Sequence, residues 1–253
     1  MTSRLTFQPG SHAYWLRNVD GKGRVRLPSV TTLLKQLDKP ALTRWASNTA
    51  AEYAIDHWQE LEQLTPSERR KQIAAAPWAS RDRAAASGTA IHSMAEQLLA
   101  GQPVEVPDSL LSKVEGLAKW IEATGIQVVA SEVKVWTEPD DEFGLVGYAG
   151  TLDALVKDPR RGFGLLDWKT GSGIYGETAL QLAGYRTAEF MVVDAVDEPM
   201  IEVDWMGAVH VQAGFSELHT LTEDQADAAS ERFHLLRLLA NTANPEFQLQ
   251  VTA

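Results

Sequence analysis

The sequence predicts an α/β fold in which a sheet is flanked by helices, with a helical annex near the N-terminus. Residues 147–156 alternate loosely between apolar and polar side chains, and residues 163–168 form a short apolar run. Residues 158–162, which include a proline and a glycine, join these two segments. Two such segments separated by a turn, and placed between stretches with helical periodicity, are typical of adjacent strands in an α/β protein.

The elements that precede these strands are expected to be a hairpin and a series of helices. Residues 12–16 and 24–27 flank a segment rich in Gly, Asn and Asp, which predicts a hairpin. A short helix is expected to begin at Pro28, and residues 40–58 carry apolar side chains close to helical spacing. Residues 65–68 form a capping box with proline at the first helical position, so another helix should begin there.

The remaining elements follow from the same periodicities. Helices are predicted over residues 77–100, 108–124, 177–193 and 222–241, and further strands over residues 128–136, 203–211 and 215–221. We expect an N-terminal region, residues 1–125, that contains the hairpin and helices, and a core, residues 126–253. The two regions should pack as one compact unit, since 253 residues are enough for one well-cored domain with an annex.

The composition restricts the classes of protein. The chain contains no cysteine, so it can hold no iron–sulfur cluster, disulfide or cysteine nucleophile. No run approaches the ~18 apolar residues of a membrane-spanning helix, so we expect no membrane partner. Residues 1–16 lack the pattern of a signal peptide, so a cytoplasmic location, in a bacterium or a phage-infected host, is expected.

Three polar residues mark the two central predicted strands. Asp153 lies in the first strand, and Asp167 and Lys169 lie at the end of the second. Because side chains alternate along a strand, Asp167 and Lys169 should share one face. Carboxylates are ligands that Mg²⁺ and Mn²⁺ prefer, and such an ion beside an ammonium group is suited to phosphodiester hydrolysis. The alternative is that Asp167 and Lys169 form an ordinary ion pair next to a turn.

Four short motifs occur in order along the chain. They are Gly-x-x-x-His, Gly-x-x-Asp, Asp-x-Lys and Gln-x-x-x-Tyr, at residues 88–92, 150–153, 167–169 and 181–185. The first and last lie in predicted helices, and the other two lie in predicted strands. With these motifs the chain resembles the RecB-like branch of the PD-(D/E)XK nuclease superfamily. The resemblance implies a restriction-endonuclease-like core with a central mixed sheet.

The resemblance also implies a metal site and a catalytic lysine. Asp153 and Asp167 would bind Mg²⁺ or Mn²⁺, helped by the backbone carbonyl of Trp168. His92 would reach the same ion from its helix. Lys169 would be the catalytic lysine, acting together with both aspartates.

Three more residues are assigned to the site through the resemblance. Glu132 lies in the strand before that of Asp153, where members of this family often have an acidic residue, and would bind or orient the metal. Gln181 and Tyr185 share one helical face because they are four residues apart, and would contact the DNA backbone or steady the metal site. For Tyr185, packing of the helix on the sheet is an equal alternative.

The activity implied is that of a metal-dependent deoxyribonuclease, most simply an exonuclease on linear DNA in recombination, repair or phage DNA processing. The chain lacks a Walker-type phosphate-binding motif, so it carries no helicase motor. A recombinase or a single-strand-binding protein is a candidate partner. Two alternatives stay open: a structure-specific endonuclease, and a DNA-binding accessory protein without turnover. The sequence indicates no oligomeric state.

The net charge of -11 opposes binding to nucleic acid, because affinity for DNA comes largely from Lys and Arg that neutralise phosphates. Local clusters can override this total. Arg81 and Arg83 are predicted to contact DNA, and residues 69–71 and the pair Arg24 and Arg26 are further basic clusters. Each cluster is equally well explained as a solvated surface.

Overall fold

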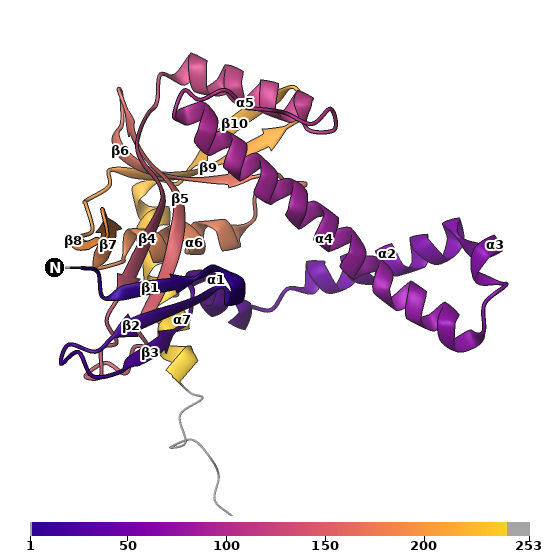
Figure 1. Ribbon diagram of the computed structural model, residues 1–253, viewed down its shortest axis with the longest axis horizontal. Helices are drawn as coiled ribbons and strands as arrows, with labels where there is room; N and C mark the ends of the chain where they lie inside the picture. The colour runs from indigo at the N-terminus through magenta and orange to yellow at the C-terminus, as the bar shows by residue number, and fades with distance from the viewer. Residues whose placement is uncertain (1, 242–253) are drawn as a thin grey trace, which may run out of the picture. The chain divides into compact units, whose positions relative to one another are not determined.

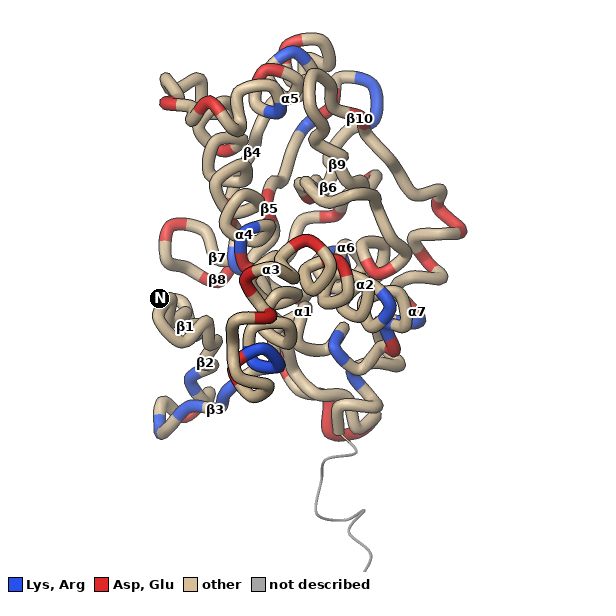
Figure 2. The backbone as a smooth tube through the Cα atoms, turned by 90° about the vertical axis from the view of Figure 1, so that its right-hand side faces the viewer, with Lys and Arg blue, Asp and Glu red and all other residues tan. Residues whose placement is uncertain are grey.

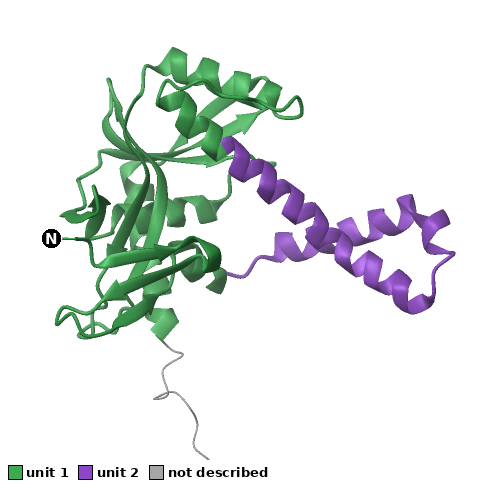
Figure 3. Cartoon of the chain, in the orientation of Figure 1, with its two compact units in different colours: residues 1–36, 92–253 green, residues 37–91 purple. Residues whose placement is uncertain are grey.

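The computed structural model describes residues 2–241, which divide into two compact units (Figure 3). Unit 1 comprises the described residues of 1–36 and 92–253, and unit 2 comprises residues 37–91. This division differs from the boundary between residues 125 and 126 that the sequence suggests. Both the N-terminal strands and the helix that ends at residue 124 belong with the sheet, because they pack on it.

Unit 1 is an α/β structure built on a seven-stranded mixed sheet flanked by helices (Figure 1). In spatial order the strands are β10 (Phe215–Thr220), β9 (Trp205–Gln212), β6 (Gly162–Lys169), β5 (Tyr148–Asp158), β4 (Gln127–Thr137), β7 (Phe190–Val193) and β8 (Val196–Pro199). All neighbours are antiparallel except β6 and β9, which are parallel. The predicted α/β class is therefore confirmed.

The centre of this sheet is the predicted pair β5 and β6. Their register places Ala154 opposite Leu166, and a tight turn joins the two strands. Most side chains in the second half of β5 and in β6 are buried, as are seven consecutive residues of β9. Strands covered on both faces have near-continuous apolar runs, which is why residues 163–168 show little alternation.

Three helices cover the sheet. Helix α5 (Leu111–Thr124) packs along β9 and β10, helix α6 (Gly176–Arg186) contacts β5, β6 and β9, and helix α7 (Glu223–Ala240) packs on α6. Thr222 and Gln225 form a capping box at the start of α7. This agrees with the predicted start of the helix.

The prediction of one helix over residues 177–193 is wrong beyond Arg186. Residues 190–199 instead form the hairpin of β7 and β8. At its turn, Asp194 and Ala195 both have positive φ, at 48° and 60°, as a two-residue hairpin turn of the primed type requires. The apolar run 190–193 was compatible with either structure, and pairing of β7 with β4 decides it.

The N-terminal segment forms a second, three-stranded sheet. It consists of β1 (Leu5–Gln8), β2 (Ala13–Arg17) and β3 (Arg24–Leu27), so the predicted hairpin is confirmed and β1 is added to it. One face packs into a core; its buried members are Leu5, Tyr14, Leu16, Leu27, Trp136 and Ala149. The 3₁₀ turn Pro9–Ser11 joins β1 and β2, and helix α1 (Val30–Leu33) with the 3₁₀ turn Leu34–Gln36 follows β3.

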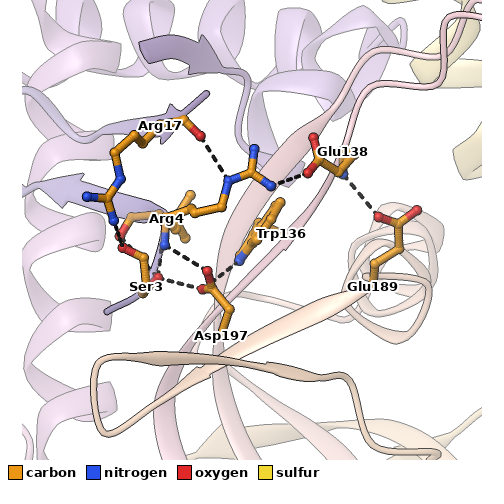
Figure 4. A network of polar contacts seen from close by, with 8 residues as sticks. Ser3, Arg4, Arg17, Trp136, Glu138, Glu189 and Asp197 are labelled. Atoms are coloured by element: carbon orange, nitrogen blue, oxygen red, sulfur yellow. Dashed lines mark hydrogen bonds and ion pairs between the residues drawn. The ribbon is translucent and has the colours of Figure 1, made fainter. Parts of the chain in front are cut away.

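Polar contacts fasten this small sheet to the large one (Figure 4). Asp197 of β8 accepts hydrogen bonds from Ser3 Oγ at 2.5 Å, from the Arg4 N–H at 2.7 Å and from Trp136 Nε1 at 3.1 Å. The Arg4 guanidinium also pairs with Glu138. Because these partners lie in or next to β4 and β8, the N-terminal sheet is a fixed part of unit 1.

Unit 2 is helical. It contains α2 (Pro40–Asp56), α3 (Trp58–Leu61) and the first part of α4 (Pro66–Leu99), whose last turns from His92 belong to unit 1. Helix α4 runs through Pro77, so the helices predicted to begin at residues 65 and 77 are one. The apolar spacing of residues 40–58 predicted a helix correctly, yet no residue of α2 is buried. None of the helices within residues 2–241 is both long and apolar enough to cross a membrane.

Candidate active site

Side chains from the four sequence motifs meet in unit 1. Asp153 lies in the middle of β5, Asp167 and Lys169 lie at the end of β6, Gln181 lies in α6, and His92 lies in the part of α4 that belongs to unit 1. Strand β6 is the common element, because it pairs with β5 and contacts α6.

Asp167, Lys169 and Gln181 form one connected group. The Lys169 ammonium lies 2.6 Å from Asp167 Oδ2 and donates a hydrogen bond to Gln181 Oε1 at 3.0 Å. Gln181 Nε2 in turn donates to Asp167 Oδ1 at 2.9 Å. The predicted placement of Asp167 and Lys169 on one face of the strand is thus confirmed, and the glutamine amide holds both residues in position.

Tyr185 extends this group towards the core. Its hydroxyl accepts a hydrogen bond from Gln181 Nε2 at 3.1 Å, while its ring is buried against β5. A Cβ atom on Gly150 would come 2.7 Å from Cε1 of Tyr185. Gly150 therefore makes room for this ring, and Tyr185 both packs the helix on the sheet and contacts the polar group.

His92 lies between two oxygen atoms, one on β6 and one on β5. Its Nε2 lies 2.7 Å from the Trp168 carbonyl oxygen, and its Nδ1 lies 3.2 Å from Asp153 Oδ2. Since a carbonyl oxygen can only accept, Nε2 carries a proton in this contact. Asp153 Oδ2 also accepts the Trp168 N–H at 2.9 Å, so the backbone of β6 positions the Asp153 carboxylate.

The electrostatics of the site reflect crowded negative charge. Burial, together with the charge of Asp153, raises the pKa of Asp167, although the Lys169 ammonium opposes this. Burial alone would lower the pKa of His92. The hydrogen bond and charge of Asp153, the charge of Asp167 and the Trp168 carbonyl outweigh burial and raise that pKa. Positive charge is therefore favoured between the two aspartates.

Glu132 faces the same region from β4, with an unusual backbone. Its φ is 50°, a left-handed conformation that costs an L-residue about 1–2 kcal/mol. Its neighbours Ser131 and Val133 pair with Ala154 and Leu152, so Glu132 lies across from Asp153. Burial and the charges of Asp153 and Glu96 raise the pKa of Glu132. A strained, acidic position beside Asp153 agrees with a functional rather than a structural role.

The donor atoms in the site are of the types that bind a hard divalent cation such as Mg²⁺ or Mn²⁺. Two carboxylates, a backbone carbonyl and an imidazole are available, and Mg²⁺ is usually bound by only one or two carboxylates together with waters and phosphate oxygens. Asp167 is almost completely buried, and its Oδ2 atom contacts the Lys169 ammonium at 2.6 Å. Within residues 2–241, however, no three His, Asp or Glu side chains are gathered as a ready-made metal cluster.

Two residues near the site were missed from the sequence. Tyr14 of β2 exchanges a hydrogen bond with Thr151 at 2.8 Å, and Thr151 lies two residues before Asp153 on β5. Nothing local predicts this contact. Glu96, whose Oε1 accepts a hydrogen bond from Ser131 at 3.2 Å, lies one helical turn after His92. Its spacing of four from His92 could have indicated it.

The two arginines predicted to bind DNA belong to unit 2. Arg81 pairs with its neighbour Asp82 at 2.7 Å, and its guanidinium lies 4.7 Å from the centre of the Trp78 ring. Arg83 is exposed and forms no ion pair with a described residue. Their role in binding DNA stays a prediction.

Comparisons with known proteins do not identify a family for this chain. No model of a known protein family matches the chain, and no curated protein is found as a relative.

Proposed function

We propose that the protein is a metal-dependent deoxyribonuclease with a restriction-endonuclease-like core, acting as an exonuclease on linear DNA in the cytoplasm. One observation supports this most strongly. Side chains from four separate motifs meet in the structure, with Asp167, Lys169 and Gln181 joined by contacts of 2.6–3.0 Å next to Asp153 and His92. An ordinary ion pair at the end of a strand would not need the glutamine or the second aspartate.

Asp153, Asp167 and the Trp168 carbonyl would hold Mg²⁺ or Mn²⁺, with His92 beside them. Such an ion, when bound, polarises a phosphate group and lowers the pKa of water. Two carboxylates are enough for Mg²⁺, so a third acidic or histidine ligand is not required.

Lys169 would act on the reacting phosphate or on the attacking water. Asp167 and Gln181 hold its ammonium group, and Gln181 cannot turn its amide without losing its contacts to Asp167 and Tyr185. A positioned cation is effective because it stabilises the charge that develops on the phosphate without first having to reorganise. About a quarter of the Lys169 side chain is exposed, so the group is held but still accessible to substrate.

A second candidate function is DNA binding without hydrolysis. The net charge of -11 and the absence of a ready-made metal cluster among residues 2–241 favour it. The complete set of Asp153, Asp167 and Lys169 opposes it, because a site that has lost its activity has no reason to keep the lysine positioned by two partners.

The test is a panel of DNA substrates. Purified protein and a matched Lys169→Met variant are incubated with labelled linear duplex, single strands and closed circles, with Mg²⁺, with Mn²⁺ and with a chelator. Release of mononucleotides from linear DNA, dependent on metal and absent in the variant, is the expected result. Nicked circles would indicate an endonuclease instead. Binding without products in every metal would overturn the proposal in favour of the accessory role.

A further inference from the structure

The charge of the chain is unevenly distributed. Residues 1–36 contain six Lys and Arg and one Asp, a net charge of +5, whereas residues 92–253 contain ten Lys and Arg against twenty-six Asp and Glu, a net charge of -16. In Figure 2, Lys and Arg follow β2, β3 and the turn between them. The N-terminal sheet is thus the basic part of an otherwise acidic unit 1.

The basic side chains share one face of this sheet. The register of β2 and β3 places Trp15 opposite Arg26 and Arg17 opposite Arg24. Since side chains alternate along a strand, all four lie on the face away from the buried Tyr14 and Leu16. We call Trp15, Arg17, Arg24 and Arg26 the outer face; its three arginines are exposed.

The outer face carries positive charge that no residue within 2–241 neutralises through an ion pair. Arg17 and Arg24 lie directly opposite one another, and like charges at such positions destabilise a sheet. None of the three arginines forms an ion pair with a described residue, whereas Arg4 of the same segment pairs with Glu138. An anion bound at this face would remove the repulsion.

Two of these arginines are held in place around a hollow. The Arg24 guanidinium lies 4.5 Å from the centre of the Trp15 ring, and Arg17 donates a hydrogen bond to the Ser3 carbonyl at 3.1 Å. Trp15, Arg17 and Arg24, with glycines at positions 21 and 23, line a hollow of ≈ 510 Å³. Guanidinium groups held in this way are suited to phosphate, because their paired N–H groups match its oxygen atoms.

We propose that the outer face binds the sugar–phosphate backbone of the DNA that enters or leaves the candidate active site. The inference rests on the proposed nuclease function and names a docking surface for its substrate. Strand β2 connects the two places: Tyr14 points inward and contacts Thr151, close to Asp153, while its neighbour Trp15 belongs to the outer face. The two places thus lie on opposite faces of one strand, and a polynucleotide that contacts both would have to pass around the edge of the N-terminal sheet.

A DNA strand fits this surface better than an anionic membrane does. The outer face offers one aromatic side chain, and binding at a membrane surface relies on a buried apolar area as well as on charge. A broad anionic membrane would also be repelled by the net charge of -16 on the rest of unit 1. A narrow strand can follow the basic face alone.

The experiment compares two double variants that remove the same charge. Arg24→Gln with Arg26→Gln changes the outer face, and neither arginine side chain donates a hydrogen bond to another residue of the described range 2–241. Lys157→Gln with Arg160→Gln is the matched control at the turn between β5 and β6, where Lys157 likewise lies near an aromatic ring. Binding of a labelled oligonucleotide is measured by fluorescence anisotropy, with a chelator present, at several salt concentrations. Hydrolysis of bis(p-nitrophenyl) phosphate with Mn²⁺ is measured in parallel.

The outer-face variant should bind DNA about tenfold or more weakly, and the slope of log affinity against log salt should fall by roughly 1.4 to 1.8, the value for two lost phosphate contacts. The control should bind like the wild type, and all three proteins should hydrolyse the small diester equally. Equal loss in the control would overturn the inference and leave the nuclease intact. A wild type that neither binds DNA nor hydrolyses the diester would overturn both proposals. The outer-face variant is also tested for binding to phosphatidylserine vesicles. If it binds DNA as tightly as the wild type but no longer binds these vesicles, the inference that this face docks DNA is overturned.

Discussion

The candidate active site has two halves that share β6 and differ in how their polar groups are satisfied. The Lys169 half contains Asp167, Lys169, Gln181 and Tyr185, which are joined by continuous contacts. The His92 half contains His92, Asp153, Glu132 and the Trp168 carbonyl, where one imidazole lies between two oxygen atoms. The Asp167 side chain is 1% exposed and that of Asp153 is 12% exposed, although both belong to the same predicted metal site.

The difference indicates separate tasks for the two halves. The Lys169 half is organised by the protein alone, which is what a group that stabilises a transition state requires. The His92 half collects negative charge around a single imidazole, and nearby carboxylates that raise one another's pKa are stabilised by a bound cation. We therefore expect Lys169 and Gln181 to control mainly the rate of hydrolysis and His92 mainly the affinity for metal. Asp167, which contacts Lys169 and would also bind the metal, should affect both.

The largest effect is expected from the Lys169 half. Asp167→Asn and Lys169→Met should each lower the rate of DNA hydrolysis by about 10²–10³-fold or more. Lys169→Met removes the cation that would act on the reacting phosphate, and Asp167→Asn removes the carboxylate that positions this cation and would bind the metal. The rate is measured with saturating Mn²⁺, and thermal unfolding serves as the control for folding. Activity within a few-fold of wild type in either folded variant would exclude this half as the catalytic one.

Gln181→Leu should lower kcat by about 10-fold to 10²-fold, since the ammonium of Lys169 and the carboxylate of Asp167 lose the amide that positions them. The Mn²⁺ concentration for half-maximal activity should stay the same. Steady-state kinetics over a Mn²⁺ titration gives both quantities. A higher Mn²⁺ requirement with unchanged kcat would show that Gln181 acts on metal binding. The two halves would then not have separate tasks.

His92→Ala should show the opposite pattern. Loss of the imidazole that contacts Asp153 should raise the Mn²⁺ concentration for half-maximal activity about 10-fold, with kcat at saturating metal close to wild type. Isothermal titration with Mn²⁺ in the absence of DNA provides a readout that does not depend on turnover. Equal metal binding by the variant and the wild type would remove His92 from the metal site.

Gly150→Ala tests the packing that supports the Lys169 half. The added methyl group would collide with the Tyr185 ring, so the free energy of unfolding should fall by about 1–3 kcal/mol. Denaturation in urea measures the change. Gly176→Ala is the control, because a Cβ atom there meets nothing within 4 Å. Similar stability of the two variants would show that Tyr185 does not need this glycine.

The smallest expected effect is a difference in stability between two variants of Glu132, whose backbone is strained. At φ 50° an alanine keeps the strain of Glu132 and a glycine releases it. Glu132→Gly should therefore be more stable than Glu132→Ala by about 1 kcal/mol, the reverse of the usual order in a strand. Urea denaturation of both variants checks the difference. An alanine variant of higher stability would place Glu132 in an ordinary extended conformation.

Much of the local structure could be predicted. The common face of Asp167 and Lys169 follows from the period of two in a strand, and the start of α7 follows from the Thr222 capping box. The strand β7 was predicted as helix, because a short apolar run after a helix fits both structures. Its pairing with β4 lies more than fifty residues away along the chain, where periodicity carries no information.

The spacing of residues along the chain was enough to place Asp153, Asp167 and Lys169 on strands and His92 on a helix, and so to name them as candidates for one site. Three features depend on tertiary packing: Gln181 holds both Asp167 and Lys169, Tyr14 reaches Thr151, and Arg24 has no acidic partner among residues 2–241. The reason is physical. Local periodicity depends on backbone geometry within a few residues, whereas burial, charge pairing and pKa depend on side chains that packing brings together from distant parts of the chain.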